Sequence, residues 1–314
     1  MRFIDLFAGI GGFRIALESF GHSCVFSSEI DKFARQTYSA NFGHTPHGDI
    51  KKIKVNHIPK HEILCAGFPC QPFSISGKQK GFNDIRGTLF FDIIRITKYH
   101  QPKLILLENV KNLASHDNTK TLNKIISKLD YVGYDVFHKI LKSSDFGVPQ
   151  ARVRIYFVCF RKDLSVKKFI FPKSKNRNVF LNSIIDKTET SPEFLIKRDD
   201  IKIFPKKLHT NITGLIKIGA INKGRQGERI YSIEGYAPTL SATGGGPAGK
   251  TGAYLINNRI RKLTPRECAS IQGYPKKFKI PVSNNQSYKQ FGNSISIPVV
   301  KAILNEIQKI PHIY

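Results

Sequence analysis

The fold is decided by residues 2–13, which read RFIDLFAGIGGF. Residues 2–7 form an apolar run typical of a buried strand, and the glycines that follow open a helix predicted over residues 12–20. In an open α/β sheet, ligands bind at the carboxyl ends of strands, where glycine turns let the backbone come close. A dinucleotide fingerprint reads GxGxxG, but Arg14 occupies the place of the third glycine. The turn therefore predicts either a nucleotide-type ligand or a purely structural bend.

The same alternation of strand and helix continues to about Pro172 and predicts an α/β fold, with a parallel sheet flanked by helices. Further strands are expected at residues 24–28, 62–66, 103–107 and 155–160, and further helices at residues 32–42, 89–99 and 122–129. Beyond Pro172 the chain becomes rich in Lys, Asn and Ser, then in glycine and short β-like runs, which predicts a smaller domain of strands and loops. A last amphipathic helix over residues 297–308 is expected to pack back on the first domain.

The chain is strongly basic: its 314 residues include 50 Lys and Arg against 23 Asp and Glu, a formal charge of +27. Such a charge favours a polyanionic partner, although a generally basic proteome is an alternative explanation. The five cysteines are odd in number and form no CxxC pair, so we expect a reducing compartment and no metal. No apolar run approaches the roughly 18 residues that span a bilayer. We therefore expect a cytoplasmic protein without a membrane partner.

Two acidic residues follow predicted strands near the glycine turn. Glu29 closes the second strand, at about the distance where a carboxylate binds ribose hydroxyls. Asp49, within GDI at residues 48–50, is expected at a third strand end, where it would reach an adenine amino group. Either carboxylate alone is more often a solvated loop residue, but together with the turn they indicate an adenosyl ligand.

A candidate nucleophile lies in GFPCQPFS at residues 67–74, where two prolines stiffen the loop around Cys70. A lone cysteine is usually a small buried hydrophobe, but a strand-end loop of a basic protein would stabilise a thiolate. The following GKQKG at residues 77–81 suits either a lid over a bound anion or a solvated loop.

A candidate acid follows four aliphatic residues at the next strand end. We expect Glu108 to be partly desolvated, which would raise its pKa and let it donate a proton near neutral pH; a carboxylate paired with lysine is the alternative. Arg152 and Arg154, in QARVR, are expected on one side of their strand, where they would hold the glutamate or a phosphate.

In this order, the segments resemble the cytosine-5 DNA methyltransferases over essentially the whole chain. The markers are FAGIGG, GFPCQPFS, ENV, QARVRIY, LTPRECASIQGYP and YKQFGNS. The resemblance implies a Rossmann-like S-adenosylmethionine-dependent methyltransferase domain over residues 1–182, completed by residues 289–314. Residues 183–288 would form a smaller, mostly β target-recognition domain and hinge. It also implies S-adenosylmethionine as cofactor and double-stranded DNA as partner.

The family's site residues carry over onto matching positions. The methyl-donor pocket would comprise Phe7, Gly9, Gly11, Gly12, Glu29, Ile30, Asp49, Ile50, Pro69, Leu89 and Asn293. The target base would be surrounded by Cys70 as nucleophile, Glu108 as acid, Arg152 and Arg154. Gln71 and Ser76 would fill the vacancy in the duplex or hold the extruded nucleotide. Ile30 departs from a related member that has an aromatic residue there, and Pro72 replaces a small residue.

Two glycine-rich loops of the smaller domain are candidates for reading DNA. Gln226 and Arg229, in GRQGER, carry side chains that recognise base edges in the major groove. Gly245 and Gly246, in GGGP, would let backbone groups approach bases closely, although either loop could be a flexible surface segment. Both loops resemble those of a family member, which implies a GCGC site with its inner cytosine methylated. Thr243 and residues 247–249 depart from that pattern.

The sequence thus predicts a site-specific DNA (cytosine-5)-methyltransferase that acts as a bacterial, nucleoid-associated monomer, either paired with a restriction endonuclease or as an orphan. Three other classes of protein are alternatives. An RNA cytosine methyltransferase is disfavoured by the two-loop recognition domain, and a non-catalytic DNA-binding regulator by the presence of Cys70 and Glu108. A nicotinamide dehydrogenase is disfavoured by the missing third glycine and by the Pro-Cys loop.

Overall fold

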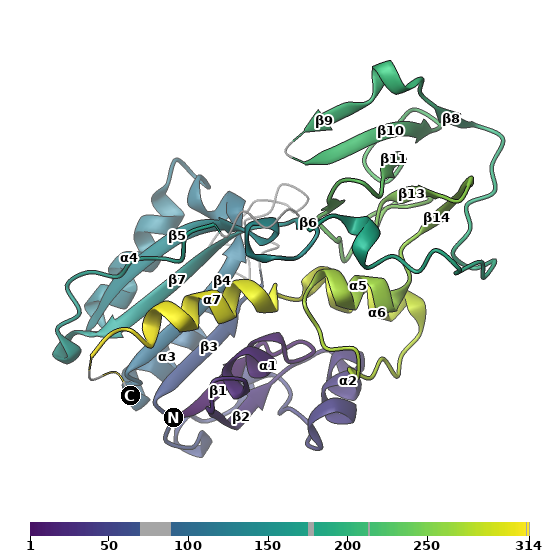
Figure 1. Ribbon diagram of the computed structural model, residues 1–314. Helices are drawn as coiled ribbons and strands as arrows, with labels where there is room; N and C mark the ends of the chain where they lie inside the picture. Colours follow the sequence, from purple (N-terminus) through teal and green to yellow (C-terminus); the bar gives the residue numbers. More distant parts are fainter. Residues whose placement is uncertain (70–88, 175–178, 213, 312, 314) are drawn as a thin grey trace. The chain divides into compact units, whose positions relative to one another are not determined.

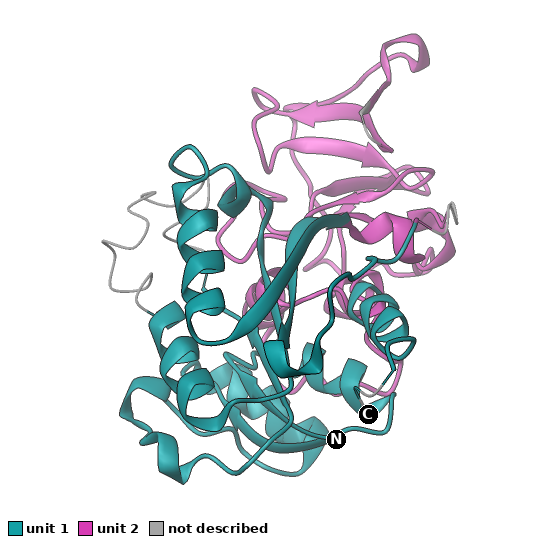
Figure 2. Ribbon diagram, turned by 90° about the vertical axis from the view of Figure 1, so that its left-hand side faces the viewer, with its two compact units in different colours: residues 1–141, 153–173, 299–314 teal, residues 142–152, 174–298 magenta. Residues whose placement is uncertain are grey.

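The computed structural model describes residues 1–69, 89–174, 179–212, 214–311 and 313. The chain forms two compact units (Figure 2). Unit 1 comprises residues 1–141, 153–173 and 299–314, and unit 2 comprises residues 142–152 and 174–298. Residues 142–152, 174–182 and 289–298, which we expected in the first domain, thus belong to unit 2. The functional division at residues 182/183 and 288/289 stays a prediction.

Unit 1 is built on a six-stranded sheet in the order β2-β1-β3-β4-β7-β5 (Figure 1). The strands are β1 (Arg2–Leu6), β2 (Ser23–Ser28), β3 (Ile63–Gly67), β4 (Leu104–Val110), β5 (Tyr134–Lys142) and β7 (Val153–Arg161). The first four run parallel, but β7 is antiparallel to β4, so the expectation of a wholly parallel sheet was wrong at this strand. A strand buried on both faces has the same apolar pattern in either direction, which is why the sequence did not reveal it.

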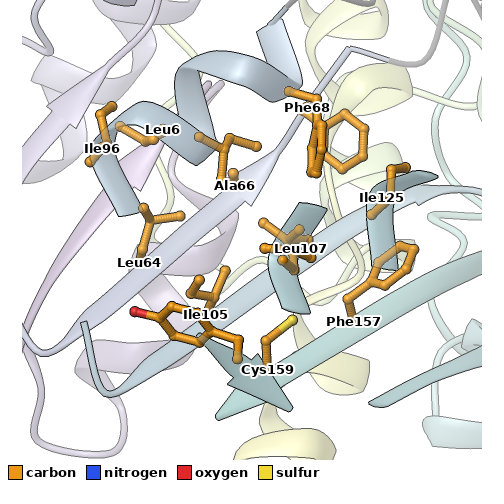
Figure 3. Close-up of a cluster of buried hydrophobic side chains, with 14 of the residues drawn as sticks. Leu6, Leu64, Ala66, Phe68, Ile96, Ile105, Leu107, Ile125, Phe157 and Cys159 are labelled. Carbon is orange, nitrogen blue, oxygen red and sulfur yellow. The ribbon is translucent and has the colours of Figure 1, made fainter. Parts of the chain in front are cut away.

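Helices cover both faces of this sheet (Figure 1). They are α1 (Gly12–Glu18), α2 (Lys32–Phe42), α3 (Leu89–His100), α4 (Lys120–Tyr131) and α7 (Ile297–Ile307). Figure 3 shows Leu64 and Ala66 of β3 and Ile105 and Leu107 of β4 within the apolar cluster that also includes side chains of α3 and α4. Burial of each Leu or Ile side chain in this cluster stabilises the fold by about 1.5–3 kcal/mol. The packing makes the sheet a rigid support for residues at its edges.

Unit 2 is mostly β, as expected. Its main sheet has the order β14-β13-β11-β10-β8, with β9 also paired to β10, and β12 pairs with β6 in a two-stranded sheet. These strands are β6 (Gln150–Ala151), β8 (Ile201–Ile203), β9 (Thr210–Ile212), β10 (Leu215–Ile221), β11 (Arg229–Ser232), β12 (Ala237–Pro238), β13 (Ala253–Ile256) and β14 (Arg259–Lys262). The helices are α5 (Pro265–Ile271) and α6 (Asn284–Asn293). A small apolar cluster that includes Ile218, Ile221 and Ile230 lies on one face of the main sheet.

Short 3₁₀ turns connect the elements: η1 (Ile50–Lys52), η2 (Val55–His57), η4 (Lys111–Ala114), η5 (Ser143–Phe146), η6 (Lys162–Leu164), η7 (Leu181–Ser183) and η8 (Lys206–Leu208). Among the described residues, no helix combines the length and the apolar character needed to cross a bilayer.

Candidate active site

Parallel strands bring the predicted site residues of unit 1 to one edge of the sheet. Leu6 of β1 pairs with Ser28 of β2 and with Ala66 of β3, while Gly67 pairs with Glu108 of β4. The residues that follow these strand ends therefore emerge at the same edge, which is where ligands bind in open α/β sheets.

The antiparallel strand β7 begins at this same edge. Because it runs against β4, its second residue, Arg154, pairs with Val110 near the carboxyl end of β4. The Arg154 Nε atom lies 3.2 Å from the Glu108 Oε1 atom, and the two side chains are only 14% and 9% exposed. A guanidinium beside a largely buried carboxylate fixes its orientation by a charge-assisted contact. The structure thus places a positioned carboxyl group at the edge where β3 leads to Cys70.

Asn109 ties the two neighbouring strand ends together. Its Nδ2 atom donates a hydrogen bond to the carbonyl oxygen of Phe68, at 3.2 Å, and its side-chain oxygen accepts from the backbone N–H of Val110. Phe68 precedes Cys70 by two residues, so this bond holds the base of the cysteine loop against β4. Sequence reasoning missed Asn109, although its place within ENV was a signal. Cys70, Gln71 and Ser76 themselves lie outside the described residues.

Arg152 has a different environment from Arg154. It is 2% exposed, and within unit 2 its guanidinium donates to the carbonyl oxygens of Gly292 and Ser294. These carbonyls flank Asn293, the exposed last residue of α6. The described hydrogen bonds of Arg152 therefore fix the backbone around a predicted cofactor residue, whereas Arg154 pairs with the predicted acid.

The glycine turn after β1 requires the conformations that glycine provides. Gly9 and Gly11 have φ of 53° and 84°, in the left-handed region, and a Cβ atom on Gly11 would lie 2.3 Å from Phe42 Cε2. The Glu29 carboxylate accepts hydrogen bonds from the backbone N–H groups of Gly9 and Asp31, both at 2.8 Å. Burial raises the pKa of Glu29, and these amide bonds partly oppose the rise. The turn and the acidic residue thus form one rigid unit.

The remaining predicted cofactor residues lie around this turn in unit 1. Ile30, directly after Glu29, is 69% exposed, which is unusual for a large apolar side chain at a strand end. Asp49 does not end a strand, as we expected, but caps η1 by accepting from the Lys51 N–H at 3.0 Å. Its segment still runs beside the end of β2, because His47 forms a parallel bridge with Ser28. Phe7, Pro69 and Leu89 are half-buried, and Gly12 and Ile50 are buried.

The two predicted DNA-reading loops contact each other in unit 2. The Ala248 N–H donates to the Gly227 carbonyl oxygen at 3.0 Å, and a Cβ atom on Gly227 would lie 2.2 Å from the Gly245 carbonyl oxygen. The glycines are therefore needed for the loops to pack on each other, a reason that sequence reasoning did not find. Gln226, Arg229, Gly245 and Gly246 are all exposed. The packing presents the candidate reading residues on one supported surface.

A glycine turn with an acidic partner lies at the same sheet edge as a guanidinium-held carboxyl group, and this arrangement is typical of an α/β enzyme with a ligand site at its strand ends. Residues 1–309 match the family described as C-5 cytosine-specific DNA methylase, and the chain belongs to this family. The resemblance found in the sequence motifs is confirmed, and the protein is a DNA cytosine-5 methyltransferase.

Characterised relatives resemble the chain over nearly its full length. It is 50% identical to the Type II methyltransferase M.HhaI of Haemophilus parahaemolyticus, over 98% of this chain and 94% of that relative. It is 44% identical to M.HaeII of Haemophilus aegyptius, over 96% and 90%. Among solved structures, the Entamoeba histolytica methyltransferase EhMeth gives a TM-score of 0.76 at 20% identity, covering 98% of both chains. A Spodoptera frugiperda DNMT2 mutant gives 0.75 at 22%, covering 98% of this chain and 99% of that one. At such identities these structures establish the fold.

Proposed function

We propose that this methyltransferase uses Cys70 as a covalent nucleophile on a cytosine extruded from duplex DNA, with S-adenosylmethionine as methyl donor. The observation that carries the proposal is the Arg154–Glu108 pair at the sheet edge where β3 ends and the cysteine loop begins. Covalent catalysis on a heterocycle requires a positioned acid together with a nucleophile, and Glu108 lies at the strand ends from which the Cys70 segment continues.

The chemistry follows from the low reactivity of cytosine carbon-5. The Cys70 thiolate attacks carbon-6 and forms a sulfur–carbon bond, while Glu108 gives a proton to ring nitrogen-3 and relieves the developing charge. Carbon-5 then has enamine character and accepts the sulfonium methyl group, with S-adenosylhomocysteine as the leaving group. Loss of the carbon-5 proton to a base, loss of the nitrogen-3 proton and breakage of the sulfur–carbon bond restore the aromatic ring and the free cysteine. Arg154 holds the Glu108 carboxyl group in place throughout.

The turn after β1 fits an adenosyl cofactor. Glu29, anchored by two backbone amides, presents a carboxylate of the kind that binds ribose hydroxyls, and the exposed Ile30 beside it offers an apolar surface for an adenine ring. Asp49, Ile50, Phe7, Pro69, Leu89 and Asn293, with the glycines of the turn, complete the proposed pocket. When bound, S-adenosylmethionine supplies an electrophilic sulfonium methyl group.

Base extrusion is part of the proposal because carbon-6 is inaccessible inside a stacked duplex. Flipping costs roughly a few kcal/mol, which contacts to the extruded nucleotide and to the vacated space must offset. We assign the contacts to the extruded nucleotide and to the vacated space to Gln71 and Ser76. Arg152 completes the proposed set around the base.

For the target sequence we propose GCGC, with Gln226, Arg229, Gly245 and Gly246 reading base edges. The support is the likeness of both loops to those of M.HhaI and their exposure on one supported surface. We further propose that the protein acts as a monomer in the bacterial cytoplasm, associated with the nucleoid, as the modification half of a restriction-modification system or as an orphan enzyme.

The test is Cys70→Ser, which should abolish methyl transfer from labelled S-adenosylmethionine while leaving affinity for duplex DNA within a few-fold. Cys24→Ser is the matched control, because burial raises the pKa of the Cys24 thiol to about 11 and it should be catalytically silent. A duplex with 5-fluorocytosine at the target should become covalently attached to the wild type and to Cys24→Ser, but not to Cys70→Ser. Methyl transfer by Cys70→Ser at the wild-type rate would exclude the covalent route, and bisulfite sequencing of DNA from expressing cells would show whether GCGC is the site.

A further inference from the structure

In the part of the unit 2 main sheet formed by β8, β10 and β11, exposed cations lie on the face opposite the apolar cluster. Ile203 of β8 pairs with Gly219 of β10, which pairs with Ile230 of β11, and Ile230 belongs to the apolar cluster. Residues that pair directly across strands point to the same face, and their chain neighbours point to the other. The residues next to Ile203, Gly219 and Ile230 along their strands therefore point to the opposite face of the sheet.

These neighbours form the next row, which is Lys202 of β8, Ala220 of β10 and Arg229 of β11. Lys202 and Arg229 are both exposed. Ala220 between them is buried, and the turn at Gly224 lies against it, since a Cβ atom on Gly224 would be 3.2 Å from the Ala220 Cβ atom. Neighbouring strands are about 4.8 Å apart, so the Lys202 and Arg229 backbones lie about 10 Å apart along the row. The sheet thus holds a lysine at a fixed offset from the arginine proposed to read DNA.

A second lysine lies on the same face. The Lys217 ammonium is 5.3 Å from the centroid of the Phe204 ring, and it lies near the turn at Gly224, within 3.8 Å of a Cβ atom placed there. The Arg229 Nε atom donates to the carbonyl oxygen of the same Gly224, at 3.4 Å. Two lysines and the arginine therefore surround one turn.

Two carboxylates lie close in sequence to this row, and each is bonded to another group. Glu228 accepts from Asn222 Nδ2 and from the Arg225 N–H, and Asp200 pairs with Arg198. Within the part of the chain that the structure describes, neither Lys202 nor Lys217 takes part in an ion pair. The two lysine ammonium groups are therefore available to an external anion.

We propose that Lys202, supported by Lys217, binds a backbone phosphodiester of the same duplex whose guanine Arg229 reads. The inference rests on the proposed reading role of Arg229. The major groove is about 12 Å wide, so a cation about 10 Å to the side of a groove-reading arginine lies over the phosphates that border the groove. Such a contact fixes the register of the protein on DNA and carries no sequence information.

The test measures the dissociation constant for a GCGC duplex and for a scrambled duplex, at 50 and 200 mM salt, by fluorescence anisotropy. Losing one phosphate contact lowers the slope of log K against log salt by about 0.9, which reduces the ratio of the two dissociation constants by about 3.5-fold. Lys202→Gln should show this reduction equally on both duplexes, and Lys202→Arg should retain the wild-type slope. Arg229→Ala should instead lose discrimination between the duplexes.

Lys98→Gln is the charge-matched control. Lys98 is exposed in the last turn of α3, which leads back to the start of β4, at the sheet edge opposite Glu108. If Lys202→Gln keeps the same salt slope as Lys98→Gln, the phosphate contact is disproved, even where the wild type still prefers and methylates GCGC. A wild type that neither prefers nor methylates GCGC would overturn GCGC as the target sequence instead. The salt slopes would still show whether Lys202 contacts a phosphate.

Discussion

Asp5 lies in β1, just before the glycine turn, and is 1% exposed. Neither of its carboxyl oxygens has a hydrogen-bond partner among the described residues. Burial raises the pKa of Asp5 well above its usual value, and the charge of Arg14 opposes the rise only in part. A carboxyl group that resists ionisation in the folded state must make folding depend on pH.

The sign of that dependence is fixed by the raised pKa. The folded state holds the Asp5 proton more tightly than the unfolded chain, so stability falls as pH rises from the unfolded value of about 4 through the folded value. Asp5→Asn cannot ionise, so its stability relative to wild type should increase between pH 4 and pH 8, by about 1–3 kcal/mol. Urea unfolding at several pH values measures this difference.

Glu62→Gln is the opposite control, because a hydrogen bond from Arg2 lowers the pKa of Glu62. The stabilisation of the folded state by the Arg2–Glu62 bond is present above the unfolded pKa of Glu62 and is lost as pH falls. Glu62→Gln should therefore be less stable than the wild type only towards neutral pH. A difference between Asp5→Asn and wild type that stays constant with pH would show that Asp5 keeps an ordinary pKa.

Single residues at strand ends were the part of the site most open to prediction. Glu29 and Glu108 could be found because an acidic residue directly after an apolar strand is a local pattern. The partners of Arg152, and the bond from Asn109 to Phe68, could not be found, because they join segments 140 and 41 residues apart. Such contacts depend on how strands are ordered in the sheet, which no local pattern contains.

At the scale of elements, the turn into α1 tests how much the cofactor pocket depends on backbone shape. Gly11→Ala adds a Cβ atom 2.3 Å from Phe42 Cε2 at a φ of 84°. We expect a loss of about 1–3 kcal/mol in stability and at least a ten-fold weaker affinity for S-adenosylmethionine, measured by calorimetry. Gly21→Ala has a similar φ of 76° with no atom within 4 Å, so it should lose stability through strain alone and keep its cofactor affinity. Equal cofactor affinity in both variants would place the cofactor away from this turn.

Helices were predicted more closely than strand directions. The pattern over residues 32–42 gave α2 with its observed bounds, since Asp31 caps the helix and Gly43 ends it. The strand β5 was missed because its central residues are exposed and lack a clear apolar pattern. The direction of β7 was missed because the apolar pattern of a fully buried strand is the same whether the strand runs parallel or antiparallel to its neighbour. The Arg154–Glu108 pair depends on that direction, so its geometry required the structure.

At the scale of the molecule, the end of the chain returns to the unit in which it began. Residues from Val299 on belong to unit 1, and Leu304 of α7 is 0% exposed. Leu304→Ala should therefore lower the free energy of unfolding by about 2–5 kcal/mol, as for other large-to-small changes in a core. The exposed neighbour Asn305→Ala should change it by less than about 0.5 kcal/mol. Urea denaturation compares the two, and matching midpoints would mean that α7 is not part of the core.

The order of strands has a consequence for synthesis on the ribosome. β7 follows β5 along the chain but lies between β4 and β5 in the sheet. Until residue 161 has left the exit tunnel, the strand LILLENV of β4 has one open, apolar edge, which is a template for pairing with other chains. Translation of residues 111–161 is therefore the interval in which a nascent chain most needs chaperones, and fragments that stop before β7 should accumulate as aggregates.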